Sequence, residues 1–194
     1  NLNHIFNFTE TGSFDINNFP VTTTSEITFV NVKSLSAFSW TSPGPMSRNI
    51  VTVNFPVLTV SGSFILENEF SIRKINAPVL EAINGNFYLK NNSIIEVLFS
   101  SLQSINNTQI ENNSNLKELY FPQLVTANSG FYITGNSSIT TINWSQLKLV
   151  EASIYNDFII SSNSSLQTIH LNALEKVTAN LIVQGNHELI GLYT

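Results

Sequence analysis

The side chains that could do chemistry in this chain are few and scattered. Glu67 and Glu69 are the closest pair of acids, and a glycosidase needs two carboxyl groups about 5 to 9.5 Å apart across a cleft. His4, His170 and His187 lie far apart without metal-ligand spacing, and the chain has no cysteine. This excludes cysteine-type zinc sites and thiol catalysis. No nucleophile-elbow, phosphate-loop or dinucleotide-binding motif is present. We therefore predict no enzyme and no catalytic, cofactor-binding or metal-binding residue.

Composition indicates one globular domain with an unusual surface. The chain has 194 residues, of which 42% are hydrophobic and only 11% are charged, against roughly 25% charged in ordinary soluble domains. The difference is made up by 27 Asn, 24 Ser and 17 Thr. The net charge is −5 with no basic stripe, so we expect no nucleic-acid partner. No apolar run approaches the roughly 20 residues of a membrane span.

One phrase recurs along most of the chain: an apolar residue, an asparagine three residues later, and then two apolar residues three apart. The clearest copy is Ile133, Asn136, Ile139 and Ile142. The other copies are Leu66–Glu69–Ile72–Ile75, Leu89–Asn92–Ile95–Leu98, Ile110–Asn113–Leu116–Leu119, Ile160–Asn163–Leu166–Ile169 and Val183–Asn186–Leu189–Leu192. The first copy has Glu where the others have Asn.

Repeats of 20 to 29 residues with a Leu/Asn signature are typical of solenoids whose coils each contribute a short strand. The copies here are 21 to 27 residues apart, and the polar gaps between them are too short for well-formed helices. We predict an all-β fold: a flattened parallel β-helix of about six to seven coils with little helix. Residues 1–49 are expected to form atypical N-terminal cap strands and a loop, and residues 50–194 one continuous solenoid.

The repeated asparagine falls at the corner after each strand. Its amide can bond backbone groups left unpaired by the turn and the equivalent amide one coil away. An unsatisfied member of such a buried ladder would cost about 1–3 kcal/mol. The predicted ladder consists of Asn92, Asn113, Asn136, Asn163 and Asn186.

Two kinds of side-chain column should accompany this register. Opposite charges alternate from coil to coil in two sets, Arg73–Glu96–Lys117 and Glu67–Lys90–Glu111, and in-register parallel strands place such residues about 4.8 Å apart. The aromatic set Phe64, Phe87, Phe131 and Phe158 is interpreted as a stacked core rather than a ligand platform.

The full pattern resembles the receptor L-domain, a variant of the leucine-rich repeat. The segments that carry the resemblance are "APVLEAINGNFYLKNNSIIEVLF" at 77–99 and "FPQLVTANSGFYITGNSSITTI" at 121–142, and it covers about residues 50–194. L-domains form ligand-binding lobes of growth-factor receptor ectodomains, and similar repeats occur in fungal cell-wall and protist surface proteins. The resemblance implies a binding or structural role at the cell surface. The chain departs from animal receptor L-domains in lacking their cysteines.

Seven sequons for N-glycosylation occur in the chain, although its richness in Asn, Ser and Thr produces a similar number by chance. We expect the sequons at the ladder positions Asn136 and Asn163 to remain unglycosylated. The candidate acceptors are Asn7, Asn91, Asn106, Asn112 and Asn143, with Asn91 and Asn112 aimed outward.

Two functions fit these features. The favoured hypothesis is an extracellular or cell-surface structural glycoprotein. Its copies would associate head to tail into a filament or coat, because the sequence stops at 187–194, just past a complete repeat with no capping helix. The first strands around Ile5–Ile16 would then pair with the last coil around Leu181–Leu192. The alternative is an adhesion or recognition module that binds a protein or glycan through its strand face, with Tyr88, Tyr132 and Tyr120 as contacts.

Overall fold

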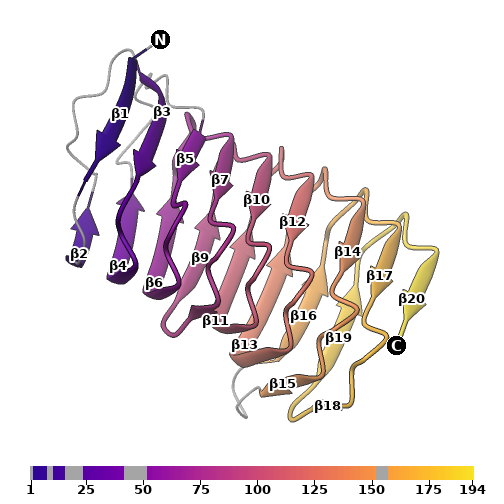
Figure 1. Cartoon of the computed structure of the whole chain (residues 1–194). Helices are drawn as coiled ribbons and strands as arrows, with labels where there is room; N and C mark the ends of the chain where they lie inside the picture. Colours follow the sequence, from indigo (N-terminus) through magenta and orange to yellow (C-terminus); the bar gives the residue numbers. More distant parts are fainter. Residues whose placement is uncertain (1, 8–10, 16–23, 42–51, 152–156) are drawn as a thin grey trace.

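The computed structural model describes residues 2–7, 11–15, 24–41, 52–151 and 157–194. These residues form twenty β-strands and no helix. Every strand pairing among them is parallel, and the coils stack into a β-solenoid of about seven turns with a spacing of about 23 residues. The predicted fold class is confirmed. Strands β1 and β20 lie at opposite ends of the stack (Figure 1).

The solenoid has two strand-bearing faces. Face A contains β1 (Leu2–Phe6), β3 (Thr24–Phe29), β5 (Thr52–Asn54), β7 (Lys74–Asn76), β10 (Glu96–Leu98), β12 (Glu118–Tyr120), β14 (Thr141–Asn143), β17 (Thr168–His170) and β20 (Gly191–Tyr193). Hydrogen bonding divides these strands into a six-stranded sheet that ends at β12 and a three-stranded sheet that begins at β14.

Face B is a single eleven-stranded sheet. It contains β2 (Thr11–Asp15), β4 (Ser34–Thr41), β6 (Val60–Glu67), β8 (Ala82–Ile83), β9 (Phe87–Lys90), β11 (Ser104–Glu111), β13 (Thr126–Thr134), β15 (Leu149–Glu151), β16 (Phe158–Ser161), β18 (Lys176–Val177) and β19 (Leu181–Gln184). The register joins the repeat columns directly: Leu66 pairs with Leu89, and Ile110 pairs with Ile133.

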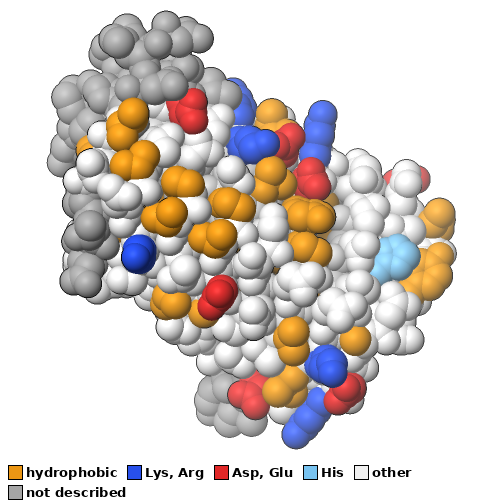
Figure 2. Space-filling model, viewed as in Figure 1, with side chains coloured by type: hydrophobic (Ala, Val, Ile, Leu, Met, Phe, Trp, Pro, Cys, Tyr) orange, Lys and Arg blue, Asp and Glu red, His pale blue; other side chains and the backbone are white. Residues whose placement is uncertain are grey.

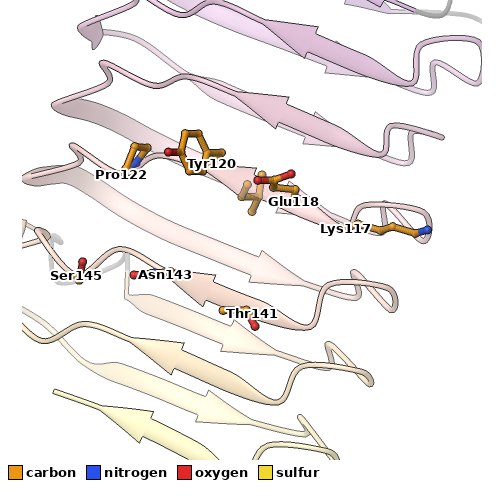
Figure 3. Close-up of a pocket in the computed structure, with 8 residues that line it drawn as sticks. Lys117, Glu118, Tyr120, Pro122, Thr141, Asn143 and Ser145 are labelled. Carbon is orange, nitrogen blue, oxygen red and sulfur yellow. The ribbon is translucent and has the colours of Figure 1, made fainter.

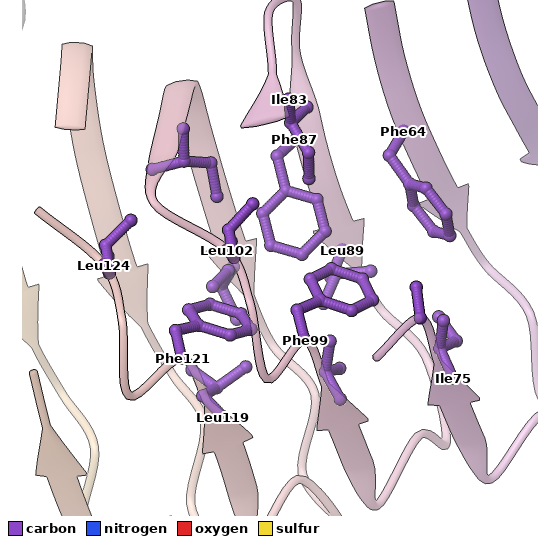
Figure 4. Close-up of a cluster of buried hydrophobic side chains, with 14 of the residues drawn as sticks. Phe64, Ile75, Ile83, Phe87, Leu89, Phe99, Leu102, Leu119, Phe121 and Leu124 are labelled. Carbon is purple, nitrogen blue, oxygen red and sulfur yellow. The ribbon is translucent and has the colours of Figure 1, made fainter. Parts of the chain in front are cut away.

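The core is an aromatic stack to which both faces contribute. The predicted aromatic residues of face B are fully buried. Face A contributes a second buried aromatic column that was not predicted from the sequence: Phe29, Phe55, Phe99, Phe121 and Trp144. Thr108 interrupts the face B column, and its hydroxyl donates to the Asn106 carbonyl at 2.9 Å. Phe87 contacts Phe99 at 5.8 Å and Phe121 at 6.2 Å between ring centroids. The rings therefore form a continuous chain along the axis (Figure 4).

One copy of the repeat is shifted by a residue relative to the sequence prediction. In the coil of Asn92, the fully buried side chains are Ile94 and Val97, whereas Ile95 and Leu98 are only half-buried. The corner of this coil is one residue shorter than the corner before it, because Lys74 lies five positions after Glu69 and its partner Glu96 lies four after Asn92. Adjacent isoleucines at 94 and 95 made the two registers indistinguishable by hydrophobicity.

The same shift corrects one of the two charge columns. Glu96 pairs with Lys74 and with Glu118, not with Arg73 and Lys117, so the predicted column Arg73–Glu96–Lys117 is wrong. A salt bridge on this face joins Lys74 Nζ to Glu96 Oε2 at 3.0 Å. The column of Glu67, Lys90 and Glu111 is confirmed by the register.

The first four strands belong to the same two faces as the later ones, since β1 and β3 continue face A to β5, and β2 and β4 continue face B to β6. The domain boundary expected at residue 49 falls within 42–51, outside the described residues.

Candidate functional site

The corner asparagines form a buried amide ladder. Asn92, Asn113, Asn136 and Asn163 are at most 3% exposed, and Asn186 is half-buried in the last coil. Each Oδ1 accepts from the backbone N–H of the ladder residue one coil earlier at 2.9–3.0 Å. Each Nδ2 donates to a strand carbonyl of that same earlier coil at 2.8–3.0 Å.

The ladder has two different ends. Glu69 opens it: its N–H donates to Asn92 Oδ1 at 2.9 Å, and its Oε1 accepts from the Ser71 N–H at 2.9 Å. Its Oε2 is buried without a hydrogen bond. At the other end lies Asn186. Every earlier ladder residue donates its backbone N–H to the asparagine side chain of the next coil. The equivalent N–H of Asn186 has no such acceptor among the described residues.

A second amide ladder, which the sequence analysis missed, runs along the outside of the same corner. Asn68, Asn91 and Asn112 have φ between 55° and 57°, a left-handed conformation that Asn tolerates better than most residues. Asn91 Nδ2 donates to Asn68 Oδ1 at 3.2 Å, and Asn112 Nδ2 donates to Asn91 Oδ1 at 3.3 Å. Gly135 takes the next place at φ +69°, and there the amides stop. The recurring Asn-Asn pair at 91–92 and 112–113 was the available signal.

The five candidate glycosylation sites lie in different surroundings. Asn7 is exposed, and its Oδ1 accepts from Asn31 Nδ2. Asn91 and Asn112 are exposed members of the outer ladder, and the half-buried Asn106 donates through Nδ2 to the Asn84 carbonyl at 3.0 Å. The exposed Asn143 is the only one of these five whose carboxamide makes no hydrogen bond to another described residue.

Face A is open at one place, between β12 and β14. In the coils on either side of this place, the residue just after each face A strand donates its backbone N–H to the next coil. Phe99 N–H donates to Tyr120 C=O at 3.1 Å, and Trp144 N–H donates to His170 C=O at 3.0 Å. The equivalent bond from Phe121 N–H to the Asn143 carbonyl is absent, and the described residues contain no strand pairing between β12 and β14. Face B and the amide ladder stay bonded at the same level. We call this opening the seam.

The seam is a crevice of about 300 Å³. Its lining residues are Lys117, Glu118, Leu119, Tyr120, Pro122, Thr141, Asn143 and Ser145. Tyr120 and Pro122 stand on one side, and Thr141, Asn143 and Ser145 stand on the other (Figure 3). An aromatic ring with hydroxyl, amide and charged groups can bind a small polar ligand.

The residues first considered for chemistry are not brought together. Glu67 points out of β6 beside Lys90, whereas Glu69 is buried in the ladder. His170 stacks on Tyr193 with ring centroids 4.6 Å apart, and His187 is exposed. Nothing is described for the side chain of His4. No group of three metal-ligating side chains occurs among the described residues.

The three tyrosines proposed as contacts do not share a face. Tyr88 and Tyr132 belong to β9 and β13 on face B, and both are half-buried. Tyr120 belongs to β12 on face A and is 45% exposed. The expected single contact surface of three tyrosines is therefore corrected to one exposed tyrosine at the seam.

No helix in the described part of the chain is long and apolar enough to cross a membrane. Comparison with known proteins found no matching family model, curated protein or solved structure.

Proposed function

We propose that this chain is an extracellular structural repeat protein whose copies associate head to tail along the axis of the solenoid. The observation that carries this proposal is the pairing of the last two described strands. Strands β19 and β20 each pair with only one neighbour in the described structure. Their far edges present backbone N–H and C=O groups that can template another strand.

The cross-section of this coil is apolar. Leu192 continues an inward column whose preceding members, Ile142 and Ile169, are at most 1% exposed, yet Leu192 is itself 44% exposed. Leu181, Val183 and Leu189 are only partly buried there. Hydrophobic side chains reach the surface at this end of the stack, and others lie over the middle of the same visible face (Figure 2).

The opposite end also contributes one strand of each face. Among the described residues, strand β1 of face A and β2 of face B each pair on one side only. Both ends of the described stack therefore carry one strand of each face with a single strand partner. A contact between unlike ends repeats without closing, which produces a filament.

The surface chemistry and the sequence resemblance support the location and the structural role. The low charge, the sequons and the likeness to receptor L-domains of cell-wall and surface proteins fit an extracellular, glycosylated repeat protein. The separation of Glu67 from Glu69 supports a role without catalysis.

Sedimentation and electron microscopy of the chain as a function of concentration test this proposal. We expect oligomers and fibres that Leu192→Lys abolishes. The matched control is Val79→Lys, because Val79 is 38% exposed but lies in the middle of the stack. A chain that stays monomeric at high concentration, or assembles equally well with Leu192→Lys, contradicts head-to-tail association.

A second candidate function is recognition of a protein or glycan. The observation that favours it is the seam, where face A offers an exposed tyrosine next to a polar crevice. In this case, binding would be localised at one level of the solenoid instead of spread along a face.

A further inference from the structure

We propose that the seam is a saccharide site, in which a pyranose ring lies on Tyr120 and its hydroxyls bridge the edges of β12 and β14. This inference deepens the recognition role and does not depend on head-to-tail association. It begins with the backbone groups that the opening leaves without partners.

Several backbone groups lose their partners at the seam, and four of them flank the two strands. In neighbouring coils, Gln167 N–H donates to Thr140 C=O at 2.8 Å and Lys117 N–H donates to Ile95 C=O at 2.9 Å. The corresponding bond from Thr140 N–H to Lys117 C=O is missing, as is the bond from Phe121 N–H to Asn143 C=O. Phe121 is 0% exposed, and a buried N–H without an acceptor is unfavourable.

These groups call for a ligand that both donates and accepts hydrogen bonds. Each side of the seam has one unpaired N–H and one unpaired carbonyl: Phe121 N–H and Lys117 C=O beside β12, and Thr140 N–H and Asn143 C=O beside β14. Each edge therefore requires both an acceptor and a donor. A hydroxyl supplies both from one atom. Sugar hydroxyls lie around the rim of a compact ring, a shape that a crevice of about 300 Å³ accommodates.

The remaining lining fits the same ligand. A pyranose has an apolar face of C–H groups, which packs against an aromatic ring, and Tyr120 is the exposed aromatic side chain of this crevice. Across from it, the carboxamide of Asn143 makes no hydrogen bond to another described residue. The hydroxyls of Thr141 and Ser145 add further partners, and Thr141 Oγ1 already lies 3.1 Å from Thr168 Oγ1. An inserted peptide strand fits less well, because β12 and β14 remain in contact.

The sugar could come from two sources with the same chemistry. One is a free glycan. The other is a glycan attached to Asn143 itself, since Asn143, Trp144 and Ser145 form a sequon and both Asn143 and Ser145 line the crevice. In either case the ring would be held by Tyr120.

The first arm of the test uses the chain made without glycosylation. Neutral mono- and oligosaccharides are titrated against it, and the amide shifts are followed by NMR. We expect shifts at Phe121 and Thr140, a rise of at least tenfold in Kd with Tyr120→Ser and little change with Tyr120→Phe. Tyr88→Ser, on the opposite face, is the matched control and should leave the Kd unchanged. Thermal unfolding of each variant verifies that it is folded.

The second arm uses the chain secreted from a glycosylating eukaryotic cell. Peptide mapping reports whether Asn143 carries a sugar, and ring-current shifts report whether that sugar lies on Tyr120. Binding of a free sugar at the seam, or an Asn143-linked sugar on Tyr120, supports the proposal and identifies the source. The proposal is overturned if neither is found, or if sugar binding persists in folded Tyr120→Ser. Neither result depends on whether copies assemble.

Discussion

The backbone N–H of Asn113 donates to Oδ1 of Asn136, one coil further along the solenoid, at 3.0 Å. In the other direction, Nδ2 of Asn136 donates to the carbonyl of Ile110 at 2.8 Å. One side chain thus satisfies two buried backbone groups of the coil before it. The ladder therefore has a direction, because each asparagine stabilises the coil on its N-terminal side.

This direction predicts the effect of Asn136→Ala. The substitution leaves the N–H of Asn113 and the carbonyl of Ile110 without their side-chain partner. Each buried polar group without a hydrogen bond lowers the free energy of unfolding by about 1–3 kcal/mol. We expect the free energy of unfolding, measured by urea denaturation, to fall by about 3 kcal/mol. Asn115→Ala should change it by less than about 0.5 kcal/mol, because Asn115 is exposed.

Hydrogen exchange distinguishes a directed ladder from a general loss of stability. In Asn136→Ala, the amide of Asn113 should lose more protection than the amide of Asn163, whose acceptor on Asn186 is untouched. Equal loss at both amides would show that the asparagine supports both neighbouring coils alike.

The outer corner makes a separate prediction at Gly135. An ideal Cβ at this position would lie 2.4 Å from Asn112 Oδ1, whereas at Gly185 the nearest atom would be 3.5 Å away. Both glycines have positive φ, which costs alanine roughly 1 kcal/mol. Gly135→Ala should therefore destabilise by more than Gly185→Ala in thermal or urea unfolding.

Asparagine at the same place should be less harmful than alanine. Asn68, Asn91 and Asn112 adopt this backbone conformation with stacked amides, so Gly135→Asn can extend the outer ladder by one rung. If Gly135→Asn is less stable than Gly135→Ala, hydrogen bonding between the outer amides does not stabilise the corner.

Sequence spacing was sufficient to predict the solenoid and the inner ladder, because asparagine at a fixed distance after an inward strand residue has a distinct physical role. It was insufficient for the coil of Asn92. There, either Ile94 or Ile95 can satisfy an apolar position, and a corner shortened by one residue leaves no trace in hydrophobicity. The error at Glu96 followed from that choice, since a shift of one residue turns every side chain to the other face.

The seam could not have been predicted from spacing. Strands β12 and β14 are 23 residues apart, the same interval as the bonded pair β17 and β20. One difference at this level is side-chain volume: Trp144 occupies the inward place that Phe99 and Phe121 hold in the two preceding coils. A pattern that treats all aromatic residues alike does not register this change.

Glycan mapping provides a further prediction from the same corner. In secreted, folded protein we expect Asn136 and Asn163 to be unmodified, because both are 0% exposed and each Nδ2 donates to a strand carbonyl. Asn91 and Asn112 are exposed, and an attached sugar leaves one hydrogen on Nδ2 for the outer ladder. Mass spectrometry of glycopeptides measures this, and a sugar on Asn136 would be incompatible with the buried ladder.

The seam itself is predicted to exchange its amide protons quickly. The N–H of Phe121 has no backbone acceptor, whereas the equivalent groups of Phe99 and Trp144 are bonded at 3.1 and 3.0 Å. We expect Phe121 to exchange at least tenfold faster than Phe99 and Trp144 in native-state hydrogen exchange by NMR, because exchange follows local opening of the hydrogen bond. Comparable protection at all three positions would mean that β12 and β14 are paired in solution.

Trp144→Phe tests what keeps the seam open. The indole stacks on Phe121 at 5.9 Å, against 5.5 Å between Phe99 and Phe121, and its Nε1 is buried without a hydrogen bond. Phenylalanine removes this unpaired donor and restores the ring size of the preceding coils. The coils can then approach until Phe121 N–H reaches Asn143 C=O. We expect the Phe121 amide to gain at least tenfold protection in this variant, whereas unchanged exchange in a folded Trp144→Phe chain would exclude the indole as the cause of the opening.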